Sequence, residues 1–111
     1  MKISLSEFQN RLPLPANEKW PDGVWDTKAF AYGSMSLVLF TPRKKDYQIS
    51  HDQDELYIVL QGKGEFVVEE DRFSFEAGEA LFVAANQRHR FENFSNDLVT
   101  WAIFWGPERV E

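Results

Sequence analysis

The chain has 111 residues, a formal net charge of -6 and no cysteine. A chain of this length suits a single domain, and without cysteine it has neither a disulfide framework nor a thiolate metal site. The acidic balance argues against nucleic acid as a partner. The sequence has no apolar run near the ~18 residues of a membrane span and no secretory signal. We therefore expect a cytoplasmic protein that binds neither membrane nor nucleic acid.

The N-terminal stretch, residues 1–30, predicts a short helix followed by an arm. Glu7 lies three residues after Ser4, the spacing of a capping box, so we expect a helix that ends near Leu12. Three prolines, one glycine and two tryptophans follow between residues 13 and 26. A disordered segment rarely carries two tryptophans, so this stretch is expected to wrap around the domain in an ordered way.

The rest of the chain, residues 31–108, predicts a β domain. Turn signals recur about every ten residues, with short alternating runs between them, which is typical of an all-β sandwich or barrel. Gly33 is expected to form a bulge or a turn inside the first run. The expected runs are 29–40, 55–61, 65–69, 72–75, 80–83, 89–93 and 98–105.

The chain has only two histidines, and each lies beside a predicted strand. Because side chains alternate between the faces of a strand, Glu55 shares a face with His51 if that strand extends back to His51. If His89 faces the same interior, two imidazoles and one carboxylate converge, a set that suits Fe(II), Mn(II), Zn(II) or Ni(II). The alternation alone leaves open that both histidines are ordinary surface or core residues.

The spacing around His51 is more specific. Glu55 follows after three residues, and Gly62 follows after six more. This resembles the first motif of the cupin superfamily, which runs Gly, five residues, His-x-His, three or four residues, Glu, six residues, Gly. Ile49 stands at the first His position and cannot ligate a metal, and Arg43 stands at the first Gly position. The usual set of three histidines and one glutamate is therefore reduced by one histidine.

The second cupin motif runs Gly, five residues, Pro-x-Gly, two residues, His, three residues, Asn. Gly78, His89 and Asn93 fall in register with it, while Ala84 and Asn86 replace the proline and the inner glycine. Because both motifs occur in the right order, the chain resembles a small single-domain cupin.

The resemblance covers about residues 34–105 and implies an all-β fold. This fold is a double-stranded β-helix, or jelly-roll barrel, preceded by a short N-terminal helix and arm. We expect the arm at residues 1–30 and the barrel at residues 31–108. The resemblance also implies a divalent metal ion, Fe, Mn, Ni or Zn, in the barrel interior. Its ligands would be His51, Glu55 and His89.

Two functions stay open at this stage. The resemblance implies a metal-dependent enzyme that acts on a small organic substrate by dioxygenation, isomerisation or decarboxylation. The alternative is a non-enzymatic module that binds or senses a small molecule and whose metal site is partly degenerate. The fold hosts many functions and does not choose between them. Tyr57 and Phe91 are the candidate substrate-binding residues above the metal, with filling of the barrel as the plainer alternative.

Two further expectations concern the surroundings of the site. Gln48 is near the missing ligand position but one residue off, so its side chain should face the other way. Leu56, Ile58 and Leu60 lie on the strand face opposite the ligands and also need cover. A barrel this small cannot cover both faces of a strand, so we expect a homodimer that packs through an outer sheet face.

Overall fold

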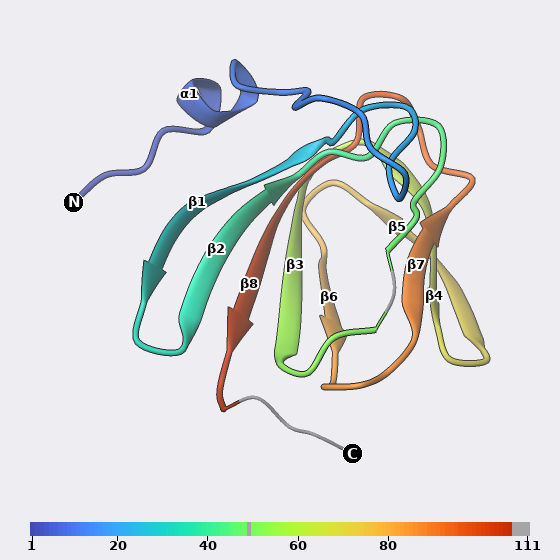
Figure 1. Cartoon of the computed structure of the whole chain (residues 1–111). Helices are drawn as coiled ribbons and strands as arrows, with labels where there is room; N and C mark the ends of the chain where they lie inside the picture. The colour runs from blue at the N-terminus through green and yellow to red at the C-terminus, as the bar shows by residue number, and fades with distance from the viewer. Residues whose placement is uncertain (49, 108–111) are drawn as a thin grey trace.

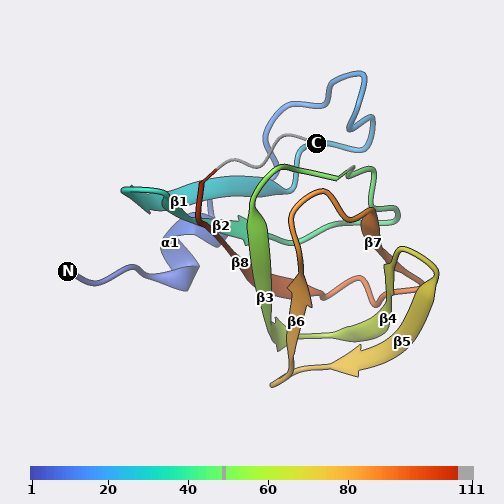
Figure 2. The ribbon, with the colours of Figure 1, turned by 90° about the horizontal axis from the view of Figure 1, so that it is seen from below.

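Eight strands and one short helix make up the part of the chain that this computed structural model describes, residues 1–48 and 50–107. The strands form two antiparallel sheets, the larger in the order β1-β2-β8-β3-β6 and the smaller in the order β5-β4-β7 (Figure 1). Figure 2 shows the two sheets facing each other. This is the jelly-roll barrel that the sequence predicts. The elements are α1 Leu5–Gln9, β1 Asp26–Tyr32, β2 Met35–Phe40, β3 Asp54–Gln61, β4 Lys63–Val68, β5 Asp71–Glu76, β6 Ala80–Val83, β7 His89–Glu92 and β8 Val99–Trp105.

The helix α1 is shorter than expected, because it ends at Gln9 and not near Leu12. Ser4 occupies the position before its first turn, but the Ser4 side chain makes no capping hydrogen bond. The Ser4 hydroxyl instead lies 3.0 Å from the hydroxyl of Ser6, so the expected capping box does not form. Among the described residues, no helix has the length and apolar character needed to cross a bilayer.

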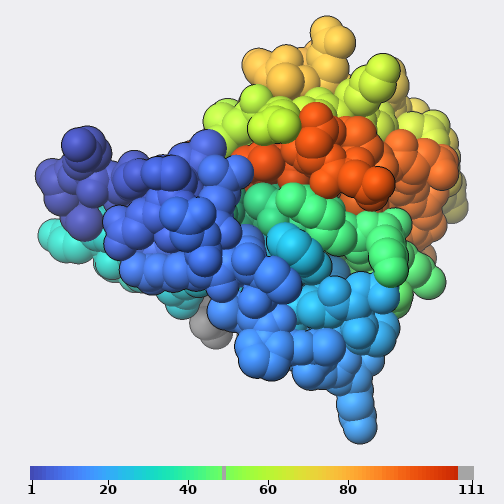
Figure 3. Space-filling model, turned by 90° about the horizontal axis from the view of Figure 1, so that it is seen from above, coloured from blue at the N-terminus to red at the C-terminus, as the bar shows by residue number. Residues whose placement is uncertain are grey.

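The arm between α1 and β1 packs onto one end of the barrel, where Figure 3 shows it in blue beside the green segment that follows β2. Backbone hydrogen bonds in both directions join Leu14 and Val24. Between them lies Trp20, which is 8% exposed. Its ring meets those of Phe40 and Tyr47 edge-on, at centroid distances of 6.1 and 5.5 Å. The arm is therefore ordered by aromatic packing.

The first strand, β1, crosses the expected boundary between the arm and the barrel. β1 begins within the predicted arm, residues 1–30, and ends within the predicted barrel, residues 31–108. The division between the two therefore stays a prediction, and residue 108 lies outside the described residues. Gly33 forms the turn between β1 and β2 with a φ of 58°, a conformation that glycine adopts without a steric penalty.

The core lies between the two sheets. On the inner face of β3, Tyr57 and Val59 are at most 1% exposed. Phe91 of β7 meets this face from the smaller sheet, and its ring lies 5.0 Å from that of Tyr57. Aromatic pairs at such distances stabilise a core beyond the area that they bury. The Phe91 ring also contacts those of Phe40, Phe66 and Phe75.

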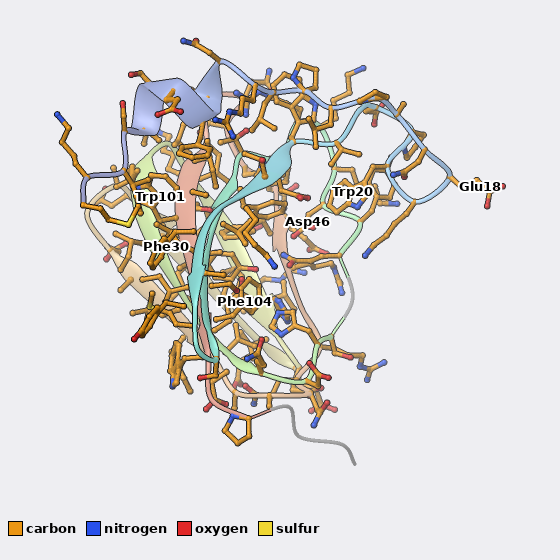
Figure 4. The ribbon with its side chains drawn as sticks, turned by 60° about the vertical axis from the view of Figure 1, so that its left-hand side comes forward. Glu18, Trp20, Phe30, Asp46, Trp101 and Phe104 are labelled. Carbon is orange, nitrogen blue, oxygen red and sulfur yellow. The ribbon has the colours of Figure 1, made fainter. Side chains whose placement is uncertain are left out.

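The larger sheet has two different sides. Figure 4 shows Phe104 on its inner side and Phe30 and Trp101 on its outer side. α1 covers one part of the outer side, where Phe8 packs in a small cluster with Leu39. The strand alternation thus separates an interior that holds the core from an outer surface that remains largely apolar.

Replacing Phe91 by alanine removes a buried ring that joins the two sheets. We expect the free energy of unfolding to fall by about 3–5 kcal/mol, because the vacated volume cannot fully collapse. Urea denaturation followed by tryptophan fluorescence measures the change. The control is Phe73→Ala: Phe73 is 41% exposed on the smaller sheet, so its loss should cost at most about 1.5 kcal/mol. Equal losses in the two variants would contradict this account of the core.

Candidate metal centre

Both sheets contribute to the candidate metal centre. Glu55 lies at the start of β3 in the larger sheet, and His89 is the first residue of β7 in the smaller sheet. His51 precedes β3, which begins at Asp54, so the strand does not extend back to His51. A backbone hydrogen bond holds His51 in place instead, since the Asn86 N–H donates to its carbonyl oxygen at 2.7 Å.

The three predicted ligands meet in the interior. The Nε2 atoms of His51 and His89 lie 2.7 and 3.2 Å from the same Glu55 oxygen, Oε1. One ligand atom from each residue lies within 4.8 Å of the other two. The side chains of Glu55 and His89 are 1% and 0% exposed, while that of His51 is 25% exposed. The cluster is therefore accessible from the His51 side.

A backbone carbonyl orients each imidazole. Nδ1 of His51 lies 3.2 Å from the Gln53 carbonyl oxygen, and Nδ1 of His89 lies 3.0 Å from the Gln87 carbonyl oxygen. Because a carbonyl oxygen only accepts, Nδ1 carries the donated proton in both rings. When the rings are neutral, their Nε2 lone pairs therefore face Glu55. Metal-bound histidines in proteins are usually held by such a second hydrogen bond.

Two buried atoms of this cluster, Oε2 of Glu55 and Nε2 of His89, have no hydrogen-bond partner. A buried polar atom without a partner typically costs ~1–3 kcal/mol. Neutral imidazoles and a carboxylate also present only acceptors to one another, so a cation between them is needed to make the arrangement favourable. A proton on an imidazole can serve, and so can a divalent metal ion, for which this ligand set is suited.

The neighbouring groups shift the pKa values of Glu55 and His89 in opposite directions. Burial tends to raise the pKa of Glu55, but its contacts with His51 and His89 outweigh burial and lower the pKa below its usual 4.5. Burial tends to lower the pKa of His89, but the Glu55 carboxylate and the Gln87 carbonyl outweigh it and raise the pKa above its usual 6.5. Each shift favours the charged form of its residue.

A cavity of about 300 Å³ adjoins two of the three residues, His51 and Glu55. The rest of its polar lining consists of Lys19, Asp26, Gln48, Ser50 and the hydroxyl of Tyr57. Figure 4 shows Trp20 of the arm turned toward the barrel, while Glu18 projects outward. A cavity with apolar walls and a few convergent polar groups is typical of a small-molecule site. The apolar part of the wall consists of Trp20, Val38, Phe40, Ala102 and Phe104.

The two candidate substrate-binding residues have different positions. Tyr57 lies in the wall of this cavity. Phe91 packs against Tyr57 in the core, with 1% of its surface exposed, and does not line the cavity. A contact between Phe91 and a substrate stays a prediction.

Gln48 has a position that the sequence did not indicate. The expectation that its side chain faces away is wrong, because Gln48 lines the cavity and accepts a hydrogen bond from the Tyr57 hydroxyl at 2.9 Å. The described residues between β2 and β3 form no strand, so the alternation of strand side chains does not apply there. No motif position or periodicity marks Gln48. Ile49, at the position of the missing ligand, lies outside the described residues.

The opposite pKa shifts of Glu55 and His89 predict how pH changes the stability of the metal-free protein. The raised pKa of His89 contributes stability that is complete below about pH 6.5 and is lost as the pH rises through the folded-state pKa. The lowered pKa of Glu55 contributes stability that is complete above about pH 4.5 and is lost as the pH falls through the folded-state pKa. Between these two values the pair should stabilise the fold most.

Urea denaturation of chelator-treated protein between about pH 4 and pH 9 measures this dependence. The comparison is with His89→Gln, which cannot titrate at this position. The stability advantage of the wild type over this variant should shrink on the alkaline side. An advantage that is the same at neutral and alkaline pH would show that the pair is not charged as described.

Comparison with known proteins places the chain in a family. A family model described as a cupin domain matches residues 36–105. An uncharacterized protein of Streptomyces coelicolor, SCO3923, is 31% identical over 75 residues, which are 68% of this chain and 71% of that protein.

Solved structures agree with this match at the level of the fold. The Clostridium difficile EutQ protein has a TM-score of 0.66 at 15% identity, covering 95% of this chain and 80% of that chain. The DMSP lyase DddQ from Ruegeria pomeroyi has a TM-score of 0.65 at 18% identity, covering 78% of this chain and 48% of that chain. The sequence match spans both motifs and most of the barrel that carries the three ligands, and it shows that this chain belongs to the cupin family.

Proposed function

We propose that this cupin holds a divalent metal ion through His51, Glu55 and His89 and binds a small organic molecule in the adjoining cavity. The observation that carries the proposal is the convergence of the three side chains on one point, with the buried Oε2 of Glu55 left without a hydrogen-bond partner. A metal ion would give that oxygen a partner. It would also take the place of the proton that the cluster otherwise needs, as happens when metal binding is coupled to deprotonation of its ligands.

A divalent ion at this place, Fe, Mn, Ni or Zn, would supply Lewis-acid or oxygen-activating chemistry. The residues of the chain orient the ligands and line the adjoining cavity. The carbonyls of Gln53 and Gln87 keep the two imidazoles in a ligating orientation. Tyr57 adds a hydroxyl to the cavity wall next to Glu55. The apolar wall would exclude water from the body of a ligand whose polar end faces the metal.

The chemistry of the bound molecule distinguishes two versions of the proposal. In the first, the protein is an enzyme of the dioxygenase, isomerase or decarboxylase type. In the second, it binds or senses a small molecule without turnover. The barrel serves an enzyme in the lyase DddQ, but a likeness in fold does not transfer that activity. Thermal protection by a small molecule that requires metal and yields no product would support the second version.

Metal binding tests the proposal directly. Wild-type protein should bind about one Zn²⁺ or Ni²⁺ per chain in calorimetric titration and retain it through gel filtration before elemental analysis. His51→Ala, His89→Ala and Glu55→Gln should each weaken binding by at least about tenfold, because even an outer-shell partner is commonly worth that much.

The matched control is Glu70→Gln, which neutralises an exposed carboxylate in the turn between β4 and β5. It should bind metal as the wild type does. The proposal fails if wild-type protein supplied with iron, manganese, nickel and zinc takes up none of them in stoichiometric amount.

The outer side of the larger sheet supports the homodimer that the sequence predicts, and we propose it as part of the functional assembly. Leu56 of β3 stands between Ile103 of β8 and Phe82 of β6 in the strand register. Phe82 is 55% exposed and lies 6.2 Å from the ring of Trp105, while Leu60 is 38% exposed. A contiguous apolar surface of this kind is typical of an interaction site.

A charge placed on this surface should separate the subunits. We expect wild-type protein to sediment as a dimer and Phe82→Asp to sediment as a monomer, because a carboxylate would have to be buried in the apolar interface. Phe73→Asp, on the smaller sheet, is the control and should remain dimeric. Sedimentation velocity measures all three proteins, and a monomeric wild type at micromolar concentration would rule out the dimer.

A further inference from the structure

A chain of hydrogen bonds runs from a buried carboxylate to the cavity. The Tyr57 hydroxyl donates to Oε1 of Gln48 at 2.9 Å, and Nε2 of Gln48 donates to Oδ2 of Asp46 at 2.5 Å. Asp46 is 4% exposed. Two backbone N–H groups, those of Gln48 and Phe91, also donate to it, each at 2.9 Å. Three donors therefore hold this carboxylate in one place.

Asp46 decides which end of the Gln48 amide faces Tyr57. A carboxylate only accepts hydrogen bonds, so it has to be met by the amide nitrogen of Gln48. The amide oxygen is then left to face the Tyr57 hydroxyl. With the amide turned round, Nε2 would face the hydroxyl and the amide oxygen would lie against the Asp46 carboxylate, acceptor against acceptor.

The direction of the Tyr57 proton matters for Glu55. The two residues are two positions apart on the inner face of β3 and line the same cavity. A tyrosine hydroxyl has a single proton to donate. Here it donates that proton to Gln48, and Oε2 of Glu55 has no hydrogen-bond partner.

We propose that Gln48, oriented by Asp46, is a positioning residue of the metal centre: it draws the Tyr57 proton away from Glu55 and so keeps the second oxygen of that carboxylate free for the metal. This inference rests on the proposed metal-binding function. Without an acceptor at position 48, the hydroxyl turns its proton to the unpartnered oxygen of Glu55. That hydrogen bond then competes with the metal, because it stabilises the carboxylate in the metal-free state.

The test is a double-mutant cycle with Zn²⁺ alone as the probe. Gln48→Met removes the acceptor and keeps a side chain of similar length, and Asp46 retains both of its backbone donors. We expect this variant to bind Zn²⁺ about tenfold more weakly than the wild type, the lower end of the range for outer-shell partners. Tyr57→Phe, measured alone, supplies the fourth corner of the cycle. The double variant Gln48→Met/Tyr57→Phe should regain most of the lost affinity, because no hydroxyl then competes for Glu55.

The rescue separates positioning from a general structural role. If Gln48 only supported the cavity, removing the Tyr57 hydroxyl would not restore Zn²⁺ affinity, so an unrescued double variant overturns the inference. A Gln48→Met variant with wild-type affinity also overturns it and leaves the metal site intact. A wild type that binds no Zn²⁺ overturns the proposed function as well. Gln48→Leu, carried through the same cycle, replaces Gln48→Met if thermal unfolding shows that the latter is not folded.

Discussion

The candidate site depends on one physical constraint. Three acceptor atoms, one from each predicted ligand, face one another in the interior. Glu55 comes from the larger sheet, His89 from the smaller sheet, and His51 from the segment that precedes β3. In the imidazoles of His51 and His89, the Nδ1 proton is donated to a backbone carbonyl, so the Nε2 lone pair of each neutral ring faces the Glu55 carboxylate. Such an arrangement is unfavourable without a cation, and the burial of Glu55 and His89 makes the requirement stricter.

The irregular segment between β2 and β3 connects this site to the fold. It carries His51 and Gln48, and its described residues form no strand. Among the hydrogen bonds that hold it are two to β7 and the loop before it: the Phe91 N–H donates to the Asp46 side chain, and the Asn86 N–H donates to the His51 carbonyl. β7 lies at the edge of its sheet, so Asp46 also satisfies a strand-edge donor. This segment therefore connects to the smaller sheet and contributes His51 and Gln48 to the site.

The arm and the larger sheet together shape the cavity. Trp20 closes part of the wall, and it is itself held by Phe40 and Tyr47. Apolar residues form much of the wall, and Lys19 and Asp26 add charged groups to it. Because the same aromatic packing that orders the arm also shapes the cavity, the shape of the cavity and the stability of this end of the barrel are physically linked.

The amino-acid sequence alone predicted the fold class and the positions of most strands, because turn residues and alternation are local signals. The convergence of His51, Glu55 and His89 was predicted by the resemblance of the two motifs to those of cupins. The sequence could not determine the position of Gln48, since no periodicity describes an irregular segment. Nor could it determine the early end of α1, where the N–H groups of Arg11 and Leu12 donate to carbonyls three residues back. It also could not separate Tyr57 from Phe91: both are buried aromatic residues on strands, and only the packing of the two sheets decides that Tyr57 faces the cavity while Phe91 lies behind it. Contacts between sheets join residues far apart in the chain, so their outcome is decided by tertiary structure.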